Sequence, residues 1–524
     1  MLHLHLSVVL LPFLSSLVLS LPVLGPCDEA VVTSISGTYT GIITDIAPHV
    51  RQFLKLPYAL SPTGSRRWLP PIKPSSNASS TYDSTTFPPS CPQYVSRVPT
   101  VQSQDVPEFQ IFTDGQGTTA GASAAETSED CLYLAVWTPV GLAVSNLPVI
   151  MFITGGGFLT GGINIPYQLP HHWVERTQAH IVVTINYRLN IMGFPDAAGL
   201  ETQNIGLLDQ RMALEWVRDN IAAFGGNPSR IMLWGQSAGA DSVDFQNFAF
   251  PNDPIASSFY MSSGNAFQRI VVSDPGHKNF SFVATHFGCA GLDSSQELDC
   301  MRTVPSNDLQ NFIGQYMDNF TLVDPTLAPL RFNPTADDVL VFSNYTERYE
   351  KGLVADRPAI VSTTTNEGVV AIPYPGTPGS SAAGQPPNQT VVDFATLLYF
   401  LCPAVQTSVL RAKLNLTTYR IQYAGNFSNV SPRPWLGAYH LSDLPPVFGT
   451  HGDFRGSSTP EEVAVSESMQ NHVFMQMQDP SARLEGVGWP NYKEGSVLVF
   501  GLNGTIMQRV NVSEIDNACT GFGV

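Results

Sequence analysis

Charged residues are scarce in this chain of 524 residues, because Asp, Glu, Lys and Arg make up only 13% of it, about half the usual share in globular proteins. Basic residues are the scarcer kind: 26 Lys and Arg stand against 43 Asp and Glu, for a formal net charge of −17. Such a charge repels phosphate backbones, which excludes nucleic acid as an expected partner. The hydrophobic content of 43% predicts a large folded core.

The chain also lacks the motifs that hold metals and nucleotides. Its seven cysteines follow no zinc-ribbon or CxxC spacing, so we expect disulfides in an oxidising compartment, with at least one cysteine unpaired. Neither a zinc-protease motif nor a phosphate loop is present, and His171 and His172 have no partner motif, so we interpret them as structural. We therefore expect no metal and no organic cofactor.

Only one long hydrophobic run is present, and it lies at the N-terminus. Residues 6–24 contain no charged side chain, and Ser20 offers a small-residue cleavage site. A membrane anchor is the alternative, but prolines and serines interrupt the run and no second span follows it. We therefore predict a signal peptide over residues 1–20, with cleavage as late as Gly25, and a secreted protein without a stable membrane anchor.

Asn-x-Ser/Thr sequons support the same secretory route, because such sites receive glycans only there. Asn227 and Asn333 do not count, because a proline follows each of them. The ten candidate acceptors are Asn77, Asn279, Asn319, Asn344, Asn388, Asn415, Asn426, Asn429, Asn503 and Asn511.

Apolar runs typical of buried strands alternate with a helical pattern in the middle of the chain. Residues 147–153 and 181–186 are continuous apolar runs, as expected for strands buried on both faces. Residues 207–224 carry apolar side chains at helical spacing, and a third apolar run follows at 231–234. This alternation requires crossover connections, so we predict an α/β fold with a large, mostly parallel sheet flanked by helices.

The third predicted strand runs directly into Gly235-Gln236-Ser237-Ala238-Gly239, and a helix-compatible segment follows. Glycines on both sides of a serine allow a turn too tight for a Cβ, which presents Ser237 Oγ above the edge of the sheet. The short pattern arises by chance in about one of four chains this rich in glycine, so its position between strand and helix is the stronger signal. Gly155–Gly157 follow the first strand, where they form either an oxyanion loop or a flexible turn.

Several longer motifs accompany this turn, and together they extend over most of the chain. They are Glu129–Leu134, Gly155–Phe158, Asn186–Arg188, Asn204–Pro228, Ala238–Ala240, Asn366–Gly368 and Gly437–Phe448. In these motifs the chain resembles the type-B carboxylesterase/cholinesterase family, most densely between residues 91 and 264. The resemblance implies the α/β-hydrolase fold, with residues 21–524 forming a single domain.

The resemblance also implies a catalytic site whose acid and histidine follow the nucleophile along the chain. The nucleophile, base and orienting acid that it implies are Ser237, His440 and Glu367, respectively. The oxyanion donors that it implies are the backbone N–H groups of Gly156, Gly157 and Ala238. We interpret the other histidines beyond residue 300, His451 and His472, as surface or packing residues.

Disulfide pairings come from the same resemblance, which implies the pairs Cys91–Cys131 and Cys289–Cys300. A third pair, Cys27–Cys519, is our own hypothesis, because it would tie the two ends of the chain together. Cys402 would then be the free, buried thiol.

The function that the resemblance implies is hydrolysis of small-molecule carboxylic esters through an acyl-enzyme. Cholinesterases place an acid before the nucleophile and a tryptophan in the first disulfide loop, to bind a quaternary ammonium group. This chain has Gln236 and no tryptophan between Cys91 and Cys131. We therefore expect neutral esters, with short to medium acyl groups, rather than choline esters.

Two alternatives stay open at this point. A lipase of the same family would act on acylglycerols, although the polar loop between Cys91 and Cys131 has only Phe109, Ile111 and Phe112 as an apolar cluster, which favours soluble esters. A non-catalytic, cholinesterase-like binding or adhesion protein would keep the fold and lack the nucleophile. The presence of all three triad residues disfavours that second alternative.

Overall fold

A large mixed sheet of eleven strands forms the centre of the protein. The structure is a computed structural model, and it describes residues 30–111, 120–141, 145–377, 385–481 and 484–523. In chain order the strands are β3 (Ile42–Thr44), β4 (Ala47–Pro57), β8 (Tyr133–Pro139), β9 (Leu147–Ile153), β10 (Ile181–Ile185), β11 (Gly226–Gln236), β12 (Ser258–Ser262), β13 (Ala359–Thr364), β14 (Thr418–Tyr423), β15 (Ser496–Leu502) and β16 (Thr505–Asn511). Their spatial order is β16-β15-β14-β13-β12-β11-β9-β10-β8-β4-β3. The neighbours from β15 to β10 pair in parallel, and the pairs outside this block are antiparallel.

Two smaller sheets and a set of helices surround this centre. The small sheets contain β1 (Val31–Ser34), β2 (Gly37–Thr40) and β5 (Thr81–Asp83), and β6 (Tyr94–Val95) with β7 (Ala122–Ser123). The helices are α1 (Val101–Gln104), α3 (His171–Thr177), α4 (Asn190–Gly193), α5 (Ile205–Asn220), α6 (Ala238–Ala249), α7 (Lys278–His286), α8 (Ser294–Arg302), α9 (Ser306–Leu322), α10 (Tyr345–Glu350), α11 (Gln389–Thr396), α12 (Cys402–Lys413), α13 (Leu444–Phe448), α14 (Pro460–Gln478) and α15 (Val512–Asp516).

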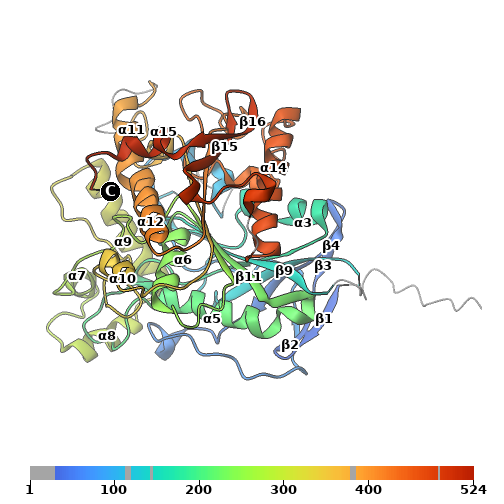
Figure 1. The fold of residues 1–524 in the computed structure, drawn as a ribbon. Coiled ribbons are helices and arrows are strands. Elements are labelled where there is room, and N and C mark those ends of the chain that lie inside the picture. The colour runs from blue at the N-terminus through green and yellow to red at the C-terminus, as the bar shows by residue number, and fades with distance from the viewer. Residues whose placement is uncertain (1–29, 112–119, 142–144, 378–384, 482–483, 524) are drawn as a thin grey trace, which may run out of the picture.

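Helices cover both faces of the central sheet, and strand β9 shows why. Successive side chains of a strand point to opposite faces, and in β9 both sets are apolar. Val149 and Met151 join the hydrophobic cluster that includes α5, whereas Ile150 and Phe152 join the cluster that includes α3 and α14. Accordingly α5 lies on one side of the sheet and α14 on the other (Figure 1). The α/β fold predicted from the continuous apolar runs is thus confirmed.

The predicted elements agree with the observed ones in the middle of the chain. Strands β9 and β10 have nearly the predicted bounds, and α5 continues into a 3₁₀ turn that ends at Phe224. Strand β11 begins five residues earlier than predicted, because Gly226 already pairs with Leu147 of β9. The sheet places the carboxyl ends of β9, β11, β12 and β13 at one edge, where ligands bind in α/β proteins.

The disulfides differ from the prediction in one pair. Cys91 is joined to Cys131 and Cys289 to Cys300, the two pairs that the resemblance implies. The third bridge joins Cys402 to Cys519, so the hypothesis of a Cys27–Cys519 bridge with a free Cys402 is wrong. The reason is packing: the C-terminal turn lies against α12, where Cys402, Val405 and Cys519 form one buried cluster. Cys27 and the predicted signal peptide lie outside the described residues.

This correction predicts which thiol is free. Non-reducing peptide mapping should recover three linked pairs, including Cys402–Cys519, because these six cysteines are already joined. Alkylation of the denatured, unreduced chain should then modify one thiol per chain, and the modified residue should be Cys27. Recovery of a modified Cys402 would contradict the structure.

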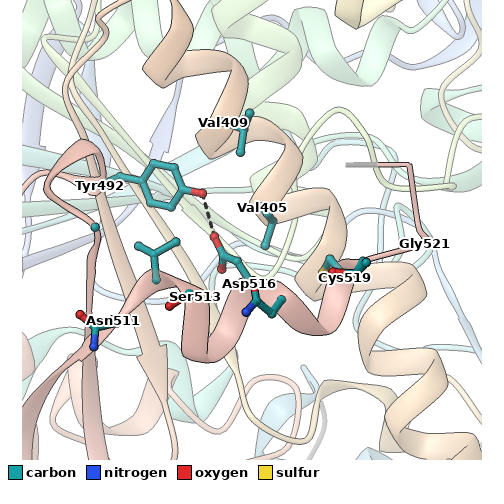
Figure 2. A pocket seen from close by; sticks show the side chains of 12 residues that line it. Val405, Val409, Tyr492, Asn511, Ser513, Asp516, Cys519 and Gly521 are labelled. Carbon is teal, nitrogen blue, oxygen red and sulfur yellow. Dashed lines mark hydrogen bonds between the residues drawn. The ribbon is translucent and has the colours of Figure 1, made fainter.

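A cavity of about 650 Å³ lies at the same C-terminal corner, between α12 and the chain end. Val405 and Val409 line its apolar side, and Tyr492 Oη donates a hydrogen bond to Asp516 at 2.7 Å (Figure 2). None of the predicted catalytic residues lines it.

The helical stretch Gln389–Lys413, to which α12 belongs, is long and apolar enough to cross a membrane. Half of its most apolar segment is buried inside the protein, however, as in the core helix of a globular protein.

One predicted glycosylation site is inaccessible. Asn429 is buried, and its Nδ2 already donates hydrogen bonds to His451 O, Ser458 Oγ and Glu462 Oε2. A glycan on this nitrogen would have no room in the folded protein. Its neighbour Asn426 is exposed, so this pair of adjacent sequons can be modified at only one position in the folded structure.

Candidate active site

Ser237 lies in the turn between the end of β11 and the start of α6. Its backbone has φ 55° and ψ −126°, a conformation that costs a non-glycine residue on the order of 1–3 kcal/mol. Ser237 N donates to Ser262 O at 2.8 Å, and Ala240 N and Asp241 N donate to Ser237 O at 2.7 and 2.9 Å. These bonds hold the strained turn from both sides, and the partly exposed serine lines a cavity.

The glycines that flank Ser237 are required by close backbone contacts. A Cβ on Gly235 would lie 2.1 Å from Gly239 O, and a Cβ on Gly239 would lie 2.0 Å from Ile153 O at the end of β9. Both distances are far shorter than any real contact, so a side chain at either position would force α6 away from the sheet. The observed turn is therefore the predicted strand-to-helix elbow.

The glycine loop after β9 lies against the same cavity. Leu159 N and Thr160 N donate to Gly156 O, and Asn333 Nδ2 donates to Gly157 O at 2.7 Å, which fixes the loop through its carbonyl groups. Within the described residues, the N–H groups of Gly156 and Gly157 donate no hydrogen bond. Ala238 is the first residue of α6, so its N–H has no partner inside the helix. Three backbone donors near Ser237 are thus available to an anionic oxygen.

His440 and Glu367 form a tight buried pair. His440 Nδ1 lies 2.6 Å from Glu367 Oε2, and the exposed fractions of the two residues are 5% and 0%. The ring of Phe400 packs against the imidazole with a centroid distance of 4.7 Å. The pair is therefore shielded from water except where His440 lines the cavity.

The carboxylate of Glu367 is held by three donors. Besides His440, Ser263 Oγ and Thr364 N donate to Oε1 at 2.6 and 2.7 Å. Because a carboxylate only accepts hydrogen bonds, Nδ1 of His440 carries the proton and Nε2 is left with a lone pair. This is the tautomer that a general base needs in order to accept a proton at Nε2.

Nε2 of His440 lies 3.1 Å from the amide nitrogen of Gln236, the residue before Ser237. The amide is fully buried and donates to the lone pair of Nε2. Among the described residues, Ser237 Oγ makes no hydrogen bond to His440. Catalytic hydrogen bonds are often long in unliganded enzymes and shorten when substrate binds.

The two loops that carry His440 and Glu367 are joined by backbone bonds, although the residues are 73 positions apart. Asn366 N donates to Ala438 O at 2.9 Å, and Asn366 Nδ2 donates to Leu436 O at 2.7 Å. A parallel bridge between Asn366 and Tyr439 completes the connection. The asparagine of the Asn-Glu-Gly motif therefore sets the distance between the two loops.

A second buried carboxyl group, Asp443, lies near this pair and was not predicted from the sequence. It accepts a hydrogen bond from Ser262 Oγ at 2.7 Å. Burial raises the pKa of Asp443 to about 6, and the charge of Glu367 adds to this shift. The sequence feature that could have pointed to Asp443 is its position three residues after His440, within the motif Gly437–Phe448.

Replacing Asp443 with asparagine is expected to change how stability depends on pH. The folded wild type keeps the Asp443 proton up to about pH 6, whereas the unfolded chain loses it near 3.8. The stability that this carboxyl group contributes below pH 3.8 is therefore lost as the pH rises through 6. Denaturant unfolding should show the variant gaining up to about 3 kcal/mol over wild type between acid and neutral pH. A difference independent of pH would contradict this assignment.

The cavity that Ser237 and His440 line has a volume of about 750 Å³. Its floor includes Gly155–Gly157, and much of its wall comes from the loop closed by the Cys91–Cys131 bridge. Phe109 and Ile111 of that loop are 6% and 9% exposed, so they pack inward and line the cavity. Phe112 lies outside the described residues.

The other histidines of the described residues do not line this cavity. His451 and His472 are buried packing residues: His451 contacts Ser458, and His472 packs against Trp489. His171, His172 and Asp453 bring their ligand atoms within 4.8 Å of one another, and His172 Nε2 lies 2.9 Å from Asp453 Oδ1. The sequence could not predict this contact, because 281 positions separate the two residues.

Comparisons with known proteins agree with this geometry. The model of the carboxylesterase family matches residues 28–385. Secreted lipase 5 of Gibberella zeae is 40% identical over 93% of this chain and 92% of its own length. Chlorogenic acid esterase of Aspergillus niger is 40% identical over 94% of each chain, and cholinesterase of Mus musculus is 31% identical over 68% of this chain and 56% of its own.

The chain belongs to the carboxylesterase family and has its α/β-hydrolase fold. It is an enzyme, a secreted carboxylic-ester hydrolase, which removes the alternative of a non-catalytic binding protein.

Proposed function

We propose that Ser237 is the nucleophile, His440 the general base and Glu367 the orienting acid of this hydrolase. His440 Nε2 takes the hydroxyl proton as Ser237 Oγ attacks the ester carbonyl carbon. The observation that carries the proposal is the 2.6 Å contact between His440 Nδ1 and Glu367 Oε2, because it places the proton on Nδ1 and leaves the lone pair of Nε2 to accept the serine proton. The imidazolium then gives its proton to the departing alcohol, and water releases the acid from the acyl-enzyme in a second, similar cycle.

The negative charge on the carbonyl oxygen needs donors in the transition state. In this proposal the N–H groups of Gly156, Gly157 and Ala238 supply them. Support comes from the bonds that hold Gly156 and Gly157 by their carbonyl oxygens, since the N–H groups then need no reorganisation during the reaction. Removal of one such donor typically costs 10²–10³ in kcat.

We further propose that the mature enzyme is one catalytic domain over residues 21–524 and that its preferred esters are soluble, with short to medium acyl groups. The inward packing of Phe109 and Ile111 supports this choice, because these apolar side chains then line the substrate cavity instead of facing a lipid surface. The similarity to chlorogenic acid esterase also supports a soluble ester as substrate.

An acylglycerol lipase is the second candidate, and the 40% identity to secreted lipase 5 favours it. A panel of 4-nitrophenyl esters of increasing acyl length, with an emulsified triacylglycerol beside it, separates the two. The esterase proposal predicts that kcat/KM falls for long acyl chains and that the rate does not rise when the triacylglycerol exceeds its solubility. A sharp rise at that point would favour the lipase.

A further inference from the structure

The cavity that contains Ser237 and His440 has an unexpected charge for so acidic a protein. The formal net charge of the chain is −17, yet no Asp or Glu is among the described residues that line the cavity. Arg97 is the one lining residue in this set whose side chain carries a full charge at neutral pH. Among the described lining residues, the cavity wall is therefore cationic at Arg97 and otherwise neutral.

Arg97 follows β6 in the loop closed by the Cys91–Cys131 bridge, and its position is fixed by neighbours. Arg97 N and Nε donate to Asp318 Oδ2 at 3.0 and 3.4 Å. The aliphatic stem passes over Gly121, where a Cβ would lie only 2.9 Å from Arg97 Cδ. Asp318, on α9, is 2% exposed, so the anchor of this arginine is buried while the arginine side chain is 57% exposed.

The hydrogen bonds of Asp318 leave donors of Arg97 unused. The Asp318 carboxylate also accepts from Tyr94 Oη and Ser96 Oγ, so donors from the segment 94–97 satisfy it. The guanidinium has five N–H donors, and its interactions with Asp318 and with the hydroxyl of Tyr94 do not use all of them. Its two terminal nitrogens form the planar fork that binds a carboxylate through two parallel hydrogen bonds.

We infer that Arg97 binds a carboxylate group of the substrate in this cavity, so that the preferred esters carry a negative charge. This inference rests on the proposed ester hydrolysis at Ser237 and replaces the expectation of neutral esters with one of anionic esters. No acid is among the described residues that line the cavity, and the like charge beside a carboxylate bound by Arg97 is the buried Asp318, which already accepts hydrogen bonds from Tyr94 and Ser96. A quaternary ammonium ester would instead face the guanidinium, which extends the argument against choline esters.

The test compares esters that differ only in this charge. One pair is a mono-4-nitrophenyl ester of a dicarboxylic acid and the same ester with its free carboxylate replaced by a carboxamide. A second pair places the carboxylate or the carboxamide on the alcohol side of an acetyl ester. Rates are measured at about 0.5 M salt, where the long-range repulsion between anions and this acidic protein is screened.

Wild type should hydrolyse the carboxylate ester of at least one pair about tenfold better, in kcat/KM, than its carboxamide partner, as expected for a charge-assisted contact. Arg97→Gln should abolish this preference while changing the carboxamide ester less than about twofold, and Arg97→Lys should restore part of it. Arg433→Gln is the matched control: Arg433 is 54% exposed and bonds the buried Asp105, but it does not line the cavity.

Two results would overturn the inference: no preference for the carboxylate in either pair with the wild type, or equal losses on both members of a pair in Arg97→Gln. The first measurement uses the unmodified protein, so a folding defect in the variant cannot hide the answer. Failure of the wild type on every ester, charged or neutral, would instead contradict the proposed function itself.

Discussion

Replacing Ser237 with alanine is expected to lower kcat by about 10⁶-fold and to leave the fold intact. No other group described in the cavity can form the acyl-enzyme in this account, because Ser237 Oγ alone is presented there by the strained elbow. The backbone bonds of the turn involve Ser237 N and O, which alanine keeps. Steady-state hydrolysis of a soluble ester measures the loss, and the melting temperature and circular dichroism of the variant check the fold.

A serine from the same cavity provides the control for this experiment. Ser103 lines the cavity at α1 but lies outside the elbow, so Ser103→Ala should keep kcat within a small factor of wild type. The double variant of Ser237 and His440 should be no slower than Ser237→Ala alone, because residues that act as one unit do not contribute additively. Ester turnover by Ser237→Ala within tenfold of wild type would contradict the assignment.

Replacing Glu367 with glutamine should lower kcat by about 10⁴-fold although the shapes of the two side chains are the same. Thr364 N can only donate, and it lies 2.7 Å from Oε1, so the amide oxygen of the variant must face Thr364. The amide NH₂ group then faces His440 Nδ1 and donates to it. This bond moves the imidazole proton to Nε2, where the base needs a lone pair, and the wrong tautomer follows.

The control for Glu367→Gln is Ser263→Ala, which removes one donor to the same carboxylate but keeps the tautomer. Its loss of kcat should be far smaller than that of Glu367→Gln. The tautomer itself can be read from the nitrogen NMR shifts of His440, which should show the proton on Nδ1 in wild type and on Nε2 in Glu367→Gln. Equal activity of Glu367→Gln and wild type would remove Glu367 from the proposed mechanism.

The elbow and the sheet around it could be predicted because their signals are local. Apolar runs such as Leu147–Ile153 predict a strand from neighbouring residues alone, and the close contacts at Gly235 and Gly239 explain why the Gly-x-Ser-x-Gly pattern is informative. The pairing of His440 with Glu367 is different. It joins two loops 73 positions apart through Asn366, and no spacing rule predicts it, so it depended on the family resemblance.

Contacts made only by tertiary packing could not be predicted from the sequence. Cys402 and Cys519 are 117 positions apart, and only the docking of the C-terminal turn on α12 selects this pair over Cys27–Cys519. Arg97 and Asp443 are ordinary charged residues in the sequence. Their significance comes from the cavity and the buried pair that they adjoin, which no local pattern reveals.

Covalent labelling identifies the nucleophile whatever the preferred ester is. An organophosphonate probe reacts with an activated serine by the same attack that the mechanism assigns to Ser237 Oγ. Mass spectrometry of the digested protein should find one label per chain, on the peptide that contains Ser237, and the Ser237→Ala variant should take up none. A label on any other serine of the wild type, or full labelling of the Ser237→Ala variant, would contradict the account.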